Sequence, residues 1–207
     1  MKNIKILSFF LFLLSHSLFA QNFSKIDQLF INGIENKLFP GAVYLLGNKT
    51  NIIYERAYGR FTYEPNAKEV TINSMFDLAS VTKVFATTMC LMKLYDEGKV
   101  NLEEKLSKYF PGYEFGEKNE VRVVDLLIHE SGLPAYYSPQ KSEKRNEIID
   151  TVINKKLVYG KNTKTVYSCL NFVTTMLLIE KIAGKSMMEF YNDNFVAPLK
   201  LKRTMYN

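Results

Sequence analysis

The stretch Phe-Asp-Leu-Ala-Ser-Val-Thr-Lys, residues 76–83, lies where a polar, irregular segment turns into a long amphipathic helix. From position 81 onward, apolar residues recur at steps of three and four, which predicts a helix that Gly98 ends. The stretch therefore sets a serine in the first turn of this helix, with a lysine three residues later. We expect the face of the helix that packs into the core to carry Val84, Phe85, Thr88, Leu91, Met92 and Tyr95.

The position of Ser80 suits a nucleophile. A serine in the first helical turn lies beside backbone N–H groups that have no partner within the helix, and its own amide can help to bind an oxyanion. Lys83 falls on the same helix face, and a buried lysine can lose its proton near neutral pH and accept the proton of the serine. We expect Phe76, Leu78 and Ala79 to bury this site from one side. The alternative is that Ser80 is only an N-cap and Lys83 a solvated helix residue.

Tyr167 lies just before an apolar helix predicted over residues 171–183. A buried tyrosine beside a cationic lysine can have its pKa lowered and can act as a general base. The alternative is that Tyr167 is a packing residue, as most tyrosines at such positions are. A second Ser-x-x-Lys, Ser138 to Lys141, lies in a polar loop with no apolar helix after it, and we discard it.

Histidine chemistry and metal binding have little support in the sequence. His129-Glu130 lacks the second histidine of a zinc-binding His-Glu-x-x-His, because Leu133 occupies that place. No Gly-x-Ser-x-Gly surrounds any serine, so we interpret His129 as a structural histidine at a helix end. We expect no cofactor and no metal. Cys90 and Cys169 are the only cysteines, and we expect both to be free thiols.

Composition and charge are typical of an ordinary globular protein, and the first residues are typical of a signal peptide. The chain has 207 residues, 47% of them hydrophobic and 23% charged, and its net charge is +6. The basic residues are scattered, which argues against a nucleic-acid partner. Lys2, Lys5, the apolar run 6–14 and Ala20 are typical of a signal peptide over residues 1–20, followed by one domain over residues 21–207. We therefore expect an exported protein, periplasmic or secreted, with no stable membrane span after cleavage.

The remaining pattern predicts an α+β fold. A helix over residues 23–38 precedes two β-like runs, residues 42–46 and 52–58, which turn residues separate, as in a hairpin. Every later segment reads as helix or loop, including a last helix that Ser186 caps. Because an isolated hairpin is marginally stable, either the hairpin packs on helices alone or the remaining strands lie outside this sequence.

These motifs, in this order, resemble the serine β-lactamase and penicillin-binding protein superfamily, in its class C-like and D-Ala-D-Ala carboxypeptidase or esterase branch. The resemblance implies a helical region beside a partial antiparallel sheet whose late strands are missing. It makes Ser80 the acylated nucleophile, Lys83 its proton partner and Tyr167 the general base. The segments that carry it are residues 39–42 and the hairpin, the nucleophile motif at 76–83, Leu-Leu-Ile-His-Glu-Ser-Gly-Leu-Pro at 126–134, Tyr-Ser-Cys-Leu-Asn-Phe at 167–172, and Pro-Leu-Lys-Leu at 198–201.

Two departures from the family pattern matter. Cys169 stands where the second motif usually has Asn, and a thiol is a weak donor for a substrate amide. A third motif, Lys-Thr-Gly or His-x-Gly, is absent from the sequence, and with it the second oxyanion amide. The resemblance thus predicts a β-lactamase-related hydrolase that forms an acyl-enzyme on an amide or ester (a β-lactam, a D-Ala-D-Ala peptide or a simple ester) and whose turnover is impaired. The alternative is a non-catalytic derivative that binds penicillin or peptidoglycan peptides, or one that has a regulatory role.

Overall fold

A computed structural model describes residues 22–206, and these residues form two compact units. Unit 1 ends at Phe76 and unit 2 begins at Asp77. The predicted signal peptide, residues 1–20, lies outside the described residues. Among the residues described, no helix is long and apolar enough to cross a membrane.

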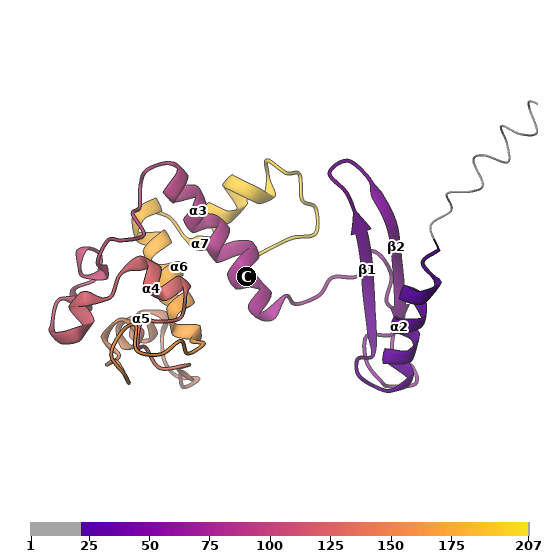
Figure 1. Cartoon of the computed structure of the whole chain (residues 1–207), viewed down its shortest axis with the longest axis horizontal. Coiled ribbons are helices and arrows are strands. Elements are labelled where there is room, and N and C mark those ends of the chain that lie inside the picture. The colour runs from indigo at the N-terminus through magenta and orange to yellow at the C-terminus, as the bar shows by residue number, and fades with distance from the viewer. Residues whose placement is uncertain (1–21, 207) are drawn as a thin grey trace, which may run out of the picture. The chain divides into compact units, whose positions relative to one another are not determined.

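Unit 1 consists of helix α2 (Ser24–Glu35) and a hairpin of strands β1 (Gly41–Gly47) and β2 (Ile52–Gly59) (Figure 1). The strands pair antiparallel from Gly41 opposite Gly59 to a register shift at the turn. The predicted hairpin is therefore confirmed. The helix ends earlier than the predicted residue 38, because the backbone turns left-handed at Lys37, where φ is 55°.

Helix α2 packs on β2 through aromatic and charged side chains. The ring of Phe30 stacks on that of Tyr58 with the centroids 4.7 Å apart. The Asp27 carboxylate accepts hydrogen bonds from the Tyr54 and Tyr58 hydroxyls and from Arg56 Nη1. The hairpin is thus stabilised by a helix, which is what an isolated two-stranded sheet requires.

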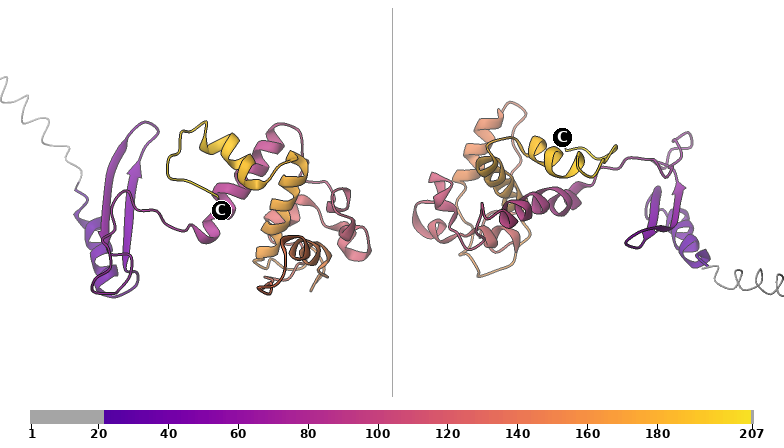
Figure 2. Two further views of the ribbon diagram at one scale, coloured as in Figure 1. Left: turned by 180° about the vertical axis from the view of Figure 1, so that it is seen from behind. Right: turned by 90° about the horizontal axis from the view of Figure 1, so that it is seen from above.

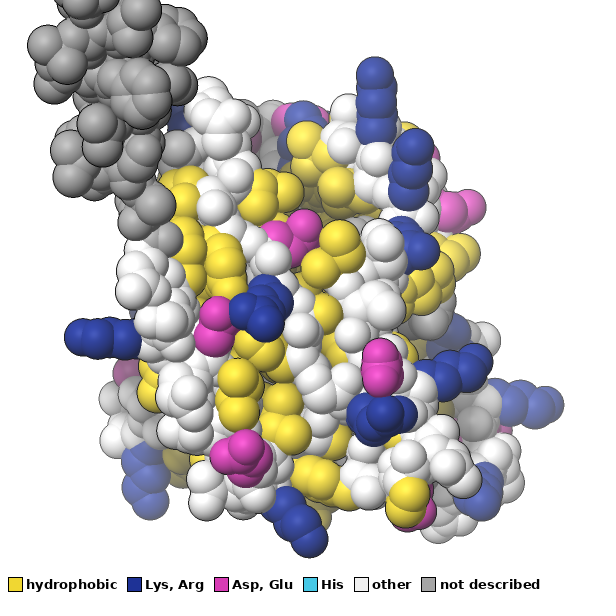
Figure 3. Space-filling model, turned by 90° about the vertical axis from the view of Figure 1, so that its right-hand side faces the viewer, with side chains coloured by type: hydrophobic (Ala, Val, Ile, Leu, Met, Phe, Trp, Pro, Cys, Tyr) yellow, Lys and Arg dark blue, Asp and Glu magenta, His cyan; other side chains and the backbone are white. Residues whose placement is uncertain are grey.

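Unit 1 also keeps many apolar side chains exposed. Figure 3 views the side of α2 and the hairpin and shows apolar side chains gathered in the middle of that face, with charged side chains among and around them. The exposed large apolar residues of the helix and strands are Leu29, Ile31, Leu45, Ile52 and Ile53.

Unit 2 is built from helices and short helical turns. Its first helix runs without a break through η1 (Ala79–Val81), a π-helical segment η2 (Lys83–Thr88) and α3 (Met89–Asp96). The elements that follow are the turns η3 (Leu106–Lys108), η4 (Pro111–Tyr113) and η5 (Gly116–Glu120), then α4 (Val123–Leu127), α5 (Arg145–Asn154), α6 (Cys169–Ala183), α7 (Met187–Tyr191) and the π-helical η6 (Asn192–Val196).

Helix α6 is the centre of this unit, because α3, α4, α5 and α7 all contact it (Figure 1 and Figure 2). Its buried residues include Leu170, Leu177, Leu178 and Ile179. The predicted capping of α7 is confirmed, since Ser186 Oγ accepts the N–H of Glu189 at 3.2 Å.

The predicted core face of the first helix is largely wrong. Leu91 is buried as expected, but Val84, Phe85, Met92 and Tyr95 are all more than half exposed. The residues that enter the core are instead Ala86, Cys90, Leu91 and Leu94. This helix carries two apolar stripes, and periodicity alone cannot decide which of them faces the core.

Candidate active site

The backbone around Ser80 leaves its hydroxyl free of capping. Asp77 Oδ1 accepts the N–H of Ala79 at 2.8 Å, in a turn directly before the helix. The backbone at Ala79 is left-handed, with φ 43°, and turns the chain into the helix. Ser80 Oγ bonds other side chains instead, and the alternative that Ser80 is the N-cap does not describe this structure.

The three residues singled out in the sequence meet at one point. Lys83 Nζ donates to Ser80 Oγ at 3.3 Å, across one turn of helix. The hydroxyl of Tyr167, 87 positions later, donates to the same oxygen at 2.8 Å. Lys83 Nζ also lies 5.4 Å from the ring centre of Tyr167 and 6.0 Å from that of Phe172. The serine oxygen thus has two possible proton acceptors within hydrogen-bonding reach.

The electrostatics of the cluster lower the pKa of Tyr167. The pKa of Tyr167 is lowered first by its hydrogen bond to Ser80, then by a hydrogen bond and the positive charge of Lys83. Desolvation raises the pKa and opposes this shift, and its effect is larger than that of the positive charge of Lys83 alone. At a given pH, a larger fraction of a tyrosine with a lowered pKa is ionised and able to accept a proton.

The expected burial of the site is not observed. Leu78 is 47% exposed, and Ala79 and Ser80 are exposed as well. Phe76 belongs to unit 1, where its ring lies 6.2 Å from that of Phe61. The apolar residues next to Ser80 predicted a buried site, but Ser80 is exposed in the part of the chain that the structure describes.

A cavity of about 250 Å³ lies beside the cluster. Lys83 and Cys169 both line it, so the thiol that replaces the expected asparagine shares a cavity with the lysine that donates to Ser80. Both cysteines are free thiols, as predicted. Burial raises the pKa of Cys90 to about 12, whereas Cys169 is partly exposed. The other lining residues are Ala79, Thr82, Thr87, Phe172, Val173, Met176 and Tyr206.

Tyr167 is held by a segment that is tied to the loop after α4. Backbone N–H groups of residues 158, 162, 166 and 169 donate to carbonyls of residues 132, 130, 129 and 135. His129 adds a side-chain contact, because its Nδ1 accepts the N–H of Ser168 at 3.1 Å. The interpretation of His129 as a structural histidine at a helix end agrees with this placement.

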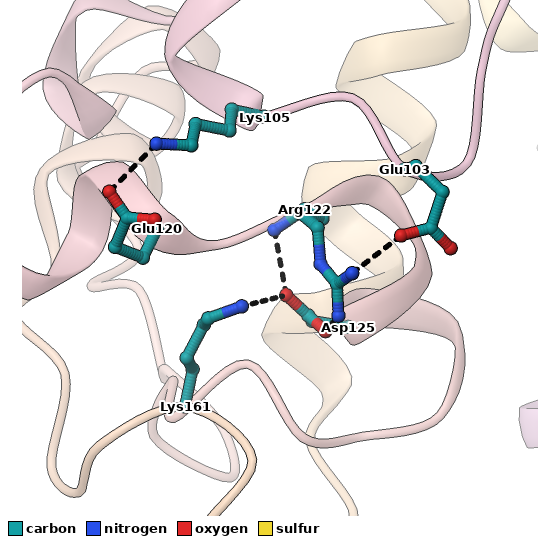
Figure 4. Close-up of polar contacts among 6 residues, drawn as sticks. All are labelled: Glu103, Lys105, Glu120, Arg122, Asp125 and Lys161. Carbon is teal, nitrogen blue, oxygen red and sulfur yellow. Dashed lines mark hydrogen bonds and ion pairs between the residues drawn. The ribbon is translucent and has the colours of Figure 1, made fainter.

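A buried carboxylate that the sequence did not single out supports the same region (Figure 4). Asp125 is fully buried and its Oδ2 accepts the N–H of Arg122 at 2.8 Å, at the start of α4. Its oxygens also lie 3.3 Å from Arg122 Nη2 and 3.5 Å from Lys161 Nζ. This contact ties the start of α4 to the segment that reaches Tyr167 six residues after Lys161. The Arg-x-x-Asp spacing was visible in the sequence, but the distant lysine was not.

Groups of three or more His, Cys, Asp or Glu that could hold a metal ion are absent from residues 22–206.

Comparisons with known proteins agree with this fold. The sequence matches the family described as Beta-lactamase over residues 26–207. A class C β-lactamase of known structure superposes with a TM-score of 0.75 at 21% identity, over 87% of this chain and 49% of that one. The structure of a penicillin-binding protein homologue from Pyrococcus abyssi gives a TM-score of 0.75 at 21% identity, over 88% and 44% of the two chains. The fold is that of the β-lactamase and transpeptidase class, as predicted.

A curated relative is closer in sequence. The N-acetylmuramyl-L-alanine amidase of Bacillus subtilis (strain 168) is 34% identical over 203 residues, which cover 88% of this chain and 46% of the relative. A protein of Salmonella typhimurium, provisionally named D-alanyl-D-alanine carboxypeptidase, is 30% identical over 84% of this chain and 46% of its own. The chain belongs to the β-lactamase family, and it spans about half the length of these curated relatives.

Proposed function

We propose that this protein is a serine hydrolase that forms an acyl-enzyme on Ser80. The observation that carries the proposal is the meeting of Lys83 Nζ and the Tyr167 hydroxyl on Ser80 Oγ, at 3.3 and 2.8 Å. A serine is a weak nucleophile at its own pKa and needs such a base beside it. The relatives' names, an amidase and a carboxypeptidase, are those of enzymes that cleave amide bonds.

The reaction would proceed in two steps. Ser80 Oγ bonds to the carbonyl carbon of an amide or ester as its proton passes to Tyr167 or Lys83, and the leaving amine or alcohol then takes up that proton. Water next attacks the ester on Ser80, which releases a carboxylic acid and restores the serine. Substrates would be a β-lactam, a peptidoglycan peptide such as D-Ala-D-Ala, or a simple ester.

We propose further that turnover by the 207-residue chain is slow. Its sequence contains no Lys-Thr-Gly or His-x-Gly, the motif that would supply the second oxyanion amide in this family. One missing donor of this kind costs about a hundredfold or more in rate. Cys169 weakens the binding of a substrate amide in addition, because a thiol donates poorly.

A labelling experiment tests the proposal. The chain is incubated with a fluorophosphonate or a fluorescent penicillin, and the modified residue is identified by peptide mass spectrometry. We expect slow labelling at Ser80 that Ser80→Ala abolishes. Ser138→Ala is the matched control, since Ser138 also precedes a lysine by three residues but lies in a loop. Labelling elsewhere, or none at any probe concentration, would contradict the acyl-enzyme.

The second candidate function is that of a non-catalytic protein that binds peptidoglycan peptides or penicillin, or regulates. Cys169 and the missing third motif favour it. Binding of a D-Ala-D-Ala peptide that Ser80→Ala leaves unchanged, in the absence of labelling, would support this candidate.

Export is a separate proposal, which rests on residues 1–20. It predicts a mature protein that begins at Gln21, after cleavage behind Ala20. N-terminal sequencing of the protein recovered from the periplasm or the medium tests it, and an intact Met1 there would contradict it.

A further inference from the structure

His129 lies two residues after α4, at the start of the loop to which the segment before Tyr167 is tied. Its backbone φ is 62°, a left-handed conformation in which histidine and asparagine are several-fold enriched among non-glycine residues. Its ring is partly buried, 4.7 Å from the ring of Tyr167 and 5.4 Å from that of Phe172, measured between centroids. The imidazole is therefore in contact with the proposed general base.

The hydrogen bonds around the ring determine where its proton lies. The N–H of Ser168 can only donate, and it points at Nδ1 from 3.1 Å. Asn171 Nδ2 lies 3.2 Å from the same nitrogen. Nδ1 must then be an acceptor, so that the single proton of a neutral ring is on Nε2.

The orientation of the Asn171 amide is determined independently. The N–H of Leu133 donates to Ser131 Oγ at 3.1 Å, and this leaves the serine proton to be given to Asn171 Oδ1 at 2.6 Å. The oxygen of the amide therefore faces Ser131, and its NH₂ group faces His129. Every donor in this buried network has one acceptor, and the network ends at Nδ1.

Burial and one charged neighbour disfavour a protonated ring. Lys83, on η2, is the cation that faces it, and burial together with this charge lowers the pKa of His129. Tyr167 faces it from the segment before α6. Glu130 is turned away, since its carboxylate accepts the Thr165 hydroxyl at 2.7 Å.

We propose that His129 is a positioning residue for Tyr167 and a proton-sensitive one. As a neutral ring, it holds the amide of Ser168 and packs on Tyr167, which keeps the tyrosine hydroxyl on Ser80. A proton on Nδ1 removes the acceptor, sets two donors against an N–H and releases the residue next to Tyr167. This role rests on the proposed function of the Ser80 cluster, but its structural part is measurable without any reaction.

Two variants of opposite chemistry separate the hydrogen bond from the ring packing. His129→Asn places an amide oxygen near the position of Nδ1, suits the left-handed backbone and cannot be protonated. His129→Phe keeps the ring contacts and has no acceptor. At about pH 8 we expect the Phe variant to label at Ser80 about tenfold more slowly, the value of one lost hydrogen bond. We expect the Asn variant to stay within about threefold of the original chain.

The pH profile is the readout that a purely structural residue would not move. Between about pH 8 and pH 5, the original chain should lose labelling rate as His129 takes up a proton, and His129→Asn should lose less. Equal losses in both chains, or a Phe variant that labels as the original does, would overturn the proposal.

NMR of the chain tests the structural part even if no probe reacts. Nitrogen-15 spectra of the imidazoles should show the Nε2–H form at neutral pH, and His16→Ala identifies which signals belong to His129. The amide of Ser168 and the ring of Tyr167 should shift together as His129 titrates. A proton on Nδ1, or a titration that Ser168 and Tyr167 do not follow, would overturn the proposal. Absence of labelling in the original chain, with this NMR result intact, would count against the acyl-enzyme alone.

Discussion

Two tyrosines in this molecule, Tyr58 in unit 1 and Tyr167 in unit 2, have neighbouring side chains that shift the pKa of their hydroxyls in opposite directions. Tyr58 is buried and donates to the Asp27 carboxylate at 2.7 Å. Burial, followed by that hydrogen bond, raises its pKa well above the usual range. The pKa of Tyr167 is lowered, by Ser80 and by the cationic Lys83. The same phenol is a structural donor in one place and a candidate base in the other, and its neighbours decide which.

Removal of each hydroxyl in turn tests whether the two tyrosines have different roles, and it has the largest expected effect. We expect Tyr167→Phe to slow labelling of Ser80 by about a hundredfold or more, the usual contribution of a general base. The matched variant Tyr58→Phe should leave labelling of Ser80 unchanged and lower the urea midpoint of unfolding, because Asp27 loses a donor. Equal effects of the two variants on labelling would mean that Tyr167 acts only by packing.

Removal of the cation should make the environment of Tyr167 more like that of an ordinary phenol. With Lys83→Met, the main positive charge near the hydroxyl is lost and the pKa of Tyr167 should rise toward its usual value. We expect labelling at neutral pH to fall by about tenfold to a hundredfold, because a base less ionised at that pH is less effective. Carbon-13 NMR of labelled tyrosine measures the pKa directly, and an unchanged value would contradict the assigned cause.

The pH dependence of labelling should follow the sign of these shifts. Because the pKa of Tyr167 lies below that of a free tyrosine, its ionised fraction begins to increase at a lower pH, and labelling should increase with it.

For stability the two tyrosines act oppositely. The lowered pKa of Tyr167 stabilises the fold above the pKa of the unfolded chain and loses this effect as pH falls through the folded value. The raised pKa of Tyr58 stabilises the fold below the unfolded value, and that effect is lost at strongly alkaline pH. Unfolding by urea between about pH 8 and pH 11, with Tyr58→Phe as the control, measures the second effect.

The smallest effect concerns the Asp27 carboxylate, which raises the pKa of Tyr58 in addition to the larger effect of burial. Asp27→Asn keeps the shape of the side chain and removes its charge, so the pKa of Tyr58 should fall toward that of a free tyrosine as the anion is lost. We expect a modest fall in the urea midpoint, larger than that of Arg56→Gln, because Arg56 is only one of three donors to Asp27 and is half exposed. Circular dichroism measures both midpoints, and a larger fall in the Arg56 variant would contradict this ranking.

Local patterns in the sequence predicted the parts of this molecule that depend on local chemistry. The hairpin followed from two short apolar runs across a turn, and Ser186 was correctly predicted as a cap. Ser80 and Lys83 were placed together by helical spacing, which the structure reproduces. That Tyr167 reaches them across 87 positions came from the resemblance and not from any local rule.

Interactions between distant segments were not predicted from the sequence. Asp27 accepts from residues 27 to 31 positions away, and Asp125 meets Lys161 across 36 positions. No spacing rule reaches over such distances. The wrong core face of the first helix has a related cause, because the choice between two apolar stripes depends on which side the rest of unit 2 packs against.

The thiol of Cys169 allows selective chemical modification next to this site. It lines the cavity next to Lys83, while Cys90 is fully buried with a pKa of about 12 and is therefore inert. Mild electrophiles should thus modify one position, and disulfide-exchange fragments attached there would sample the cavity beside Lys83. A library screened by such tethering could rank β-lactam, peptide and ester shapes by fit, without requiring a single catalytic turnover.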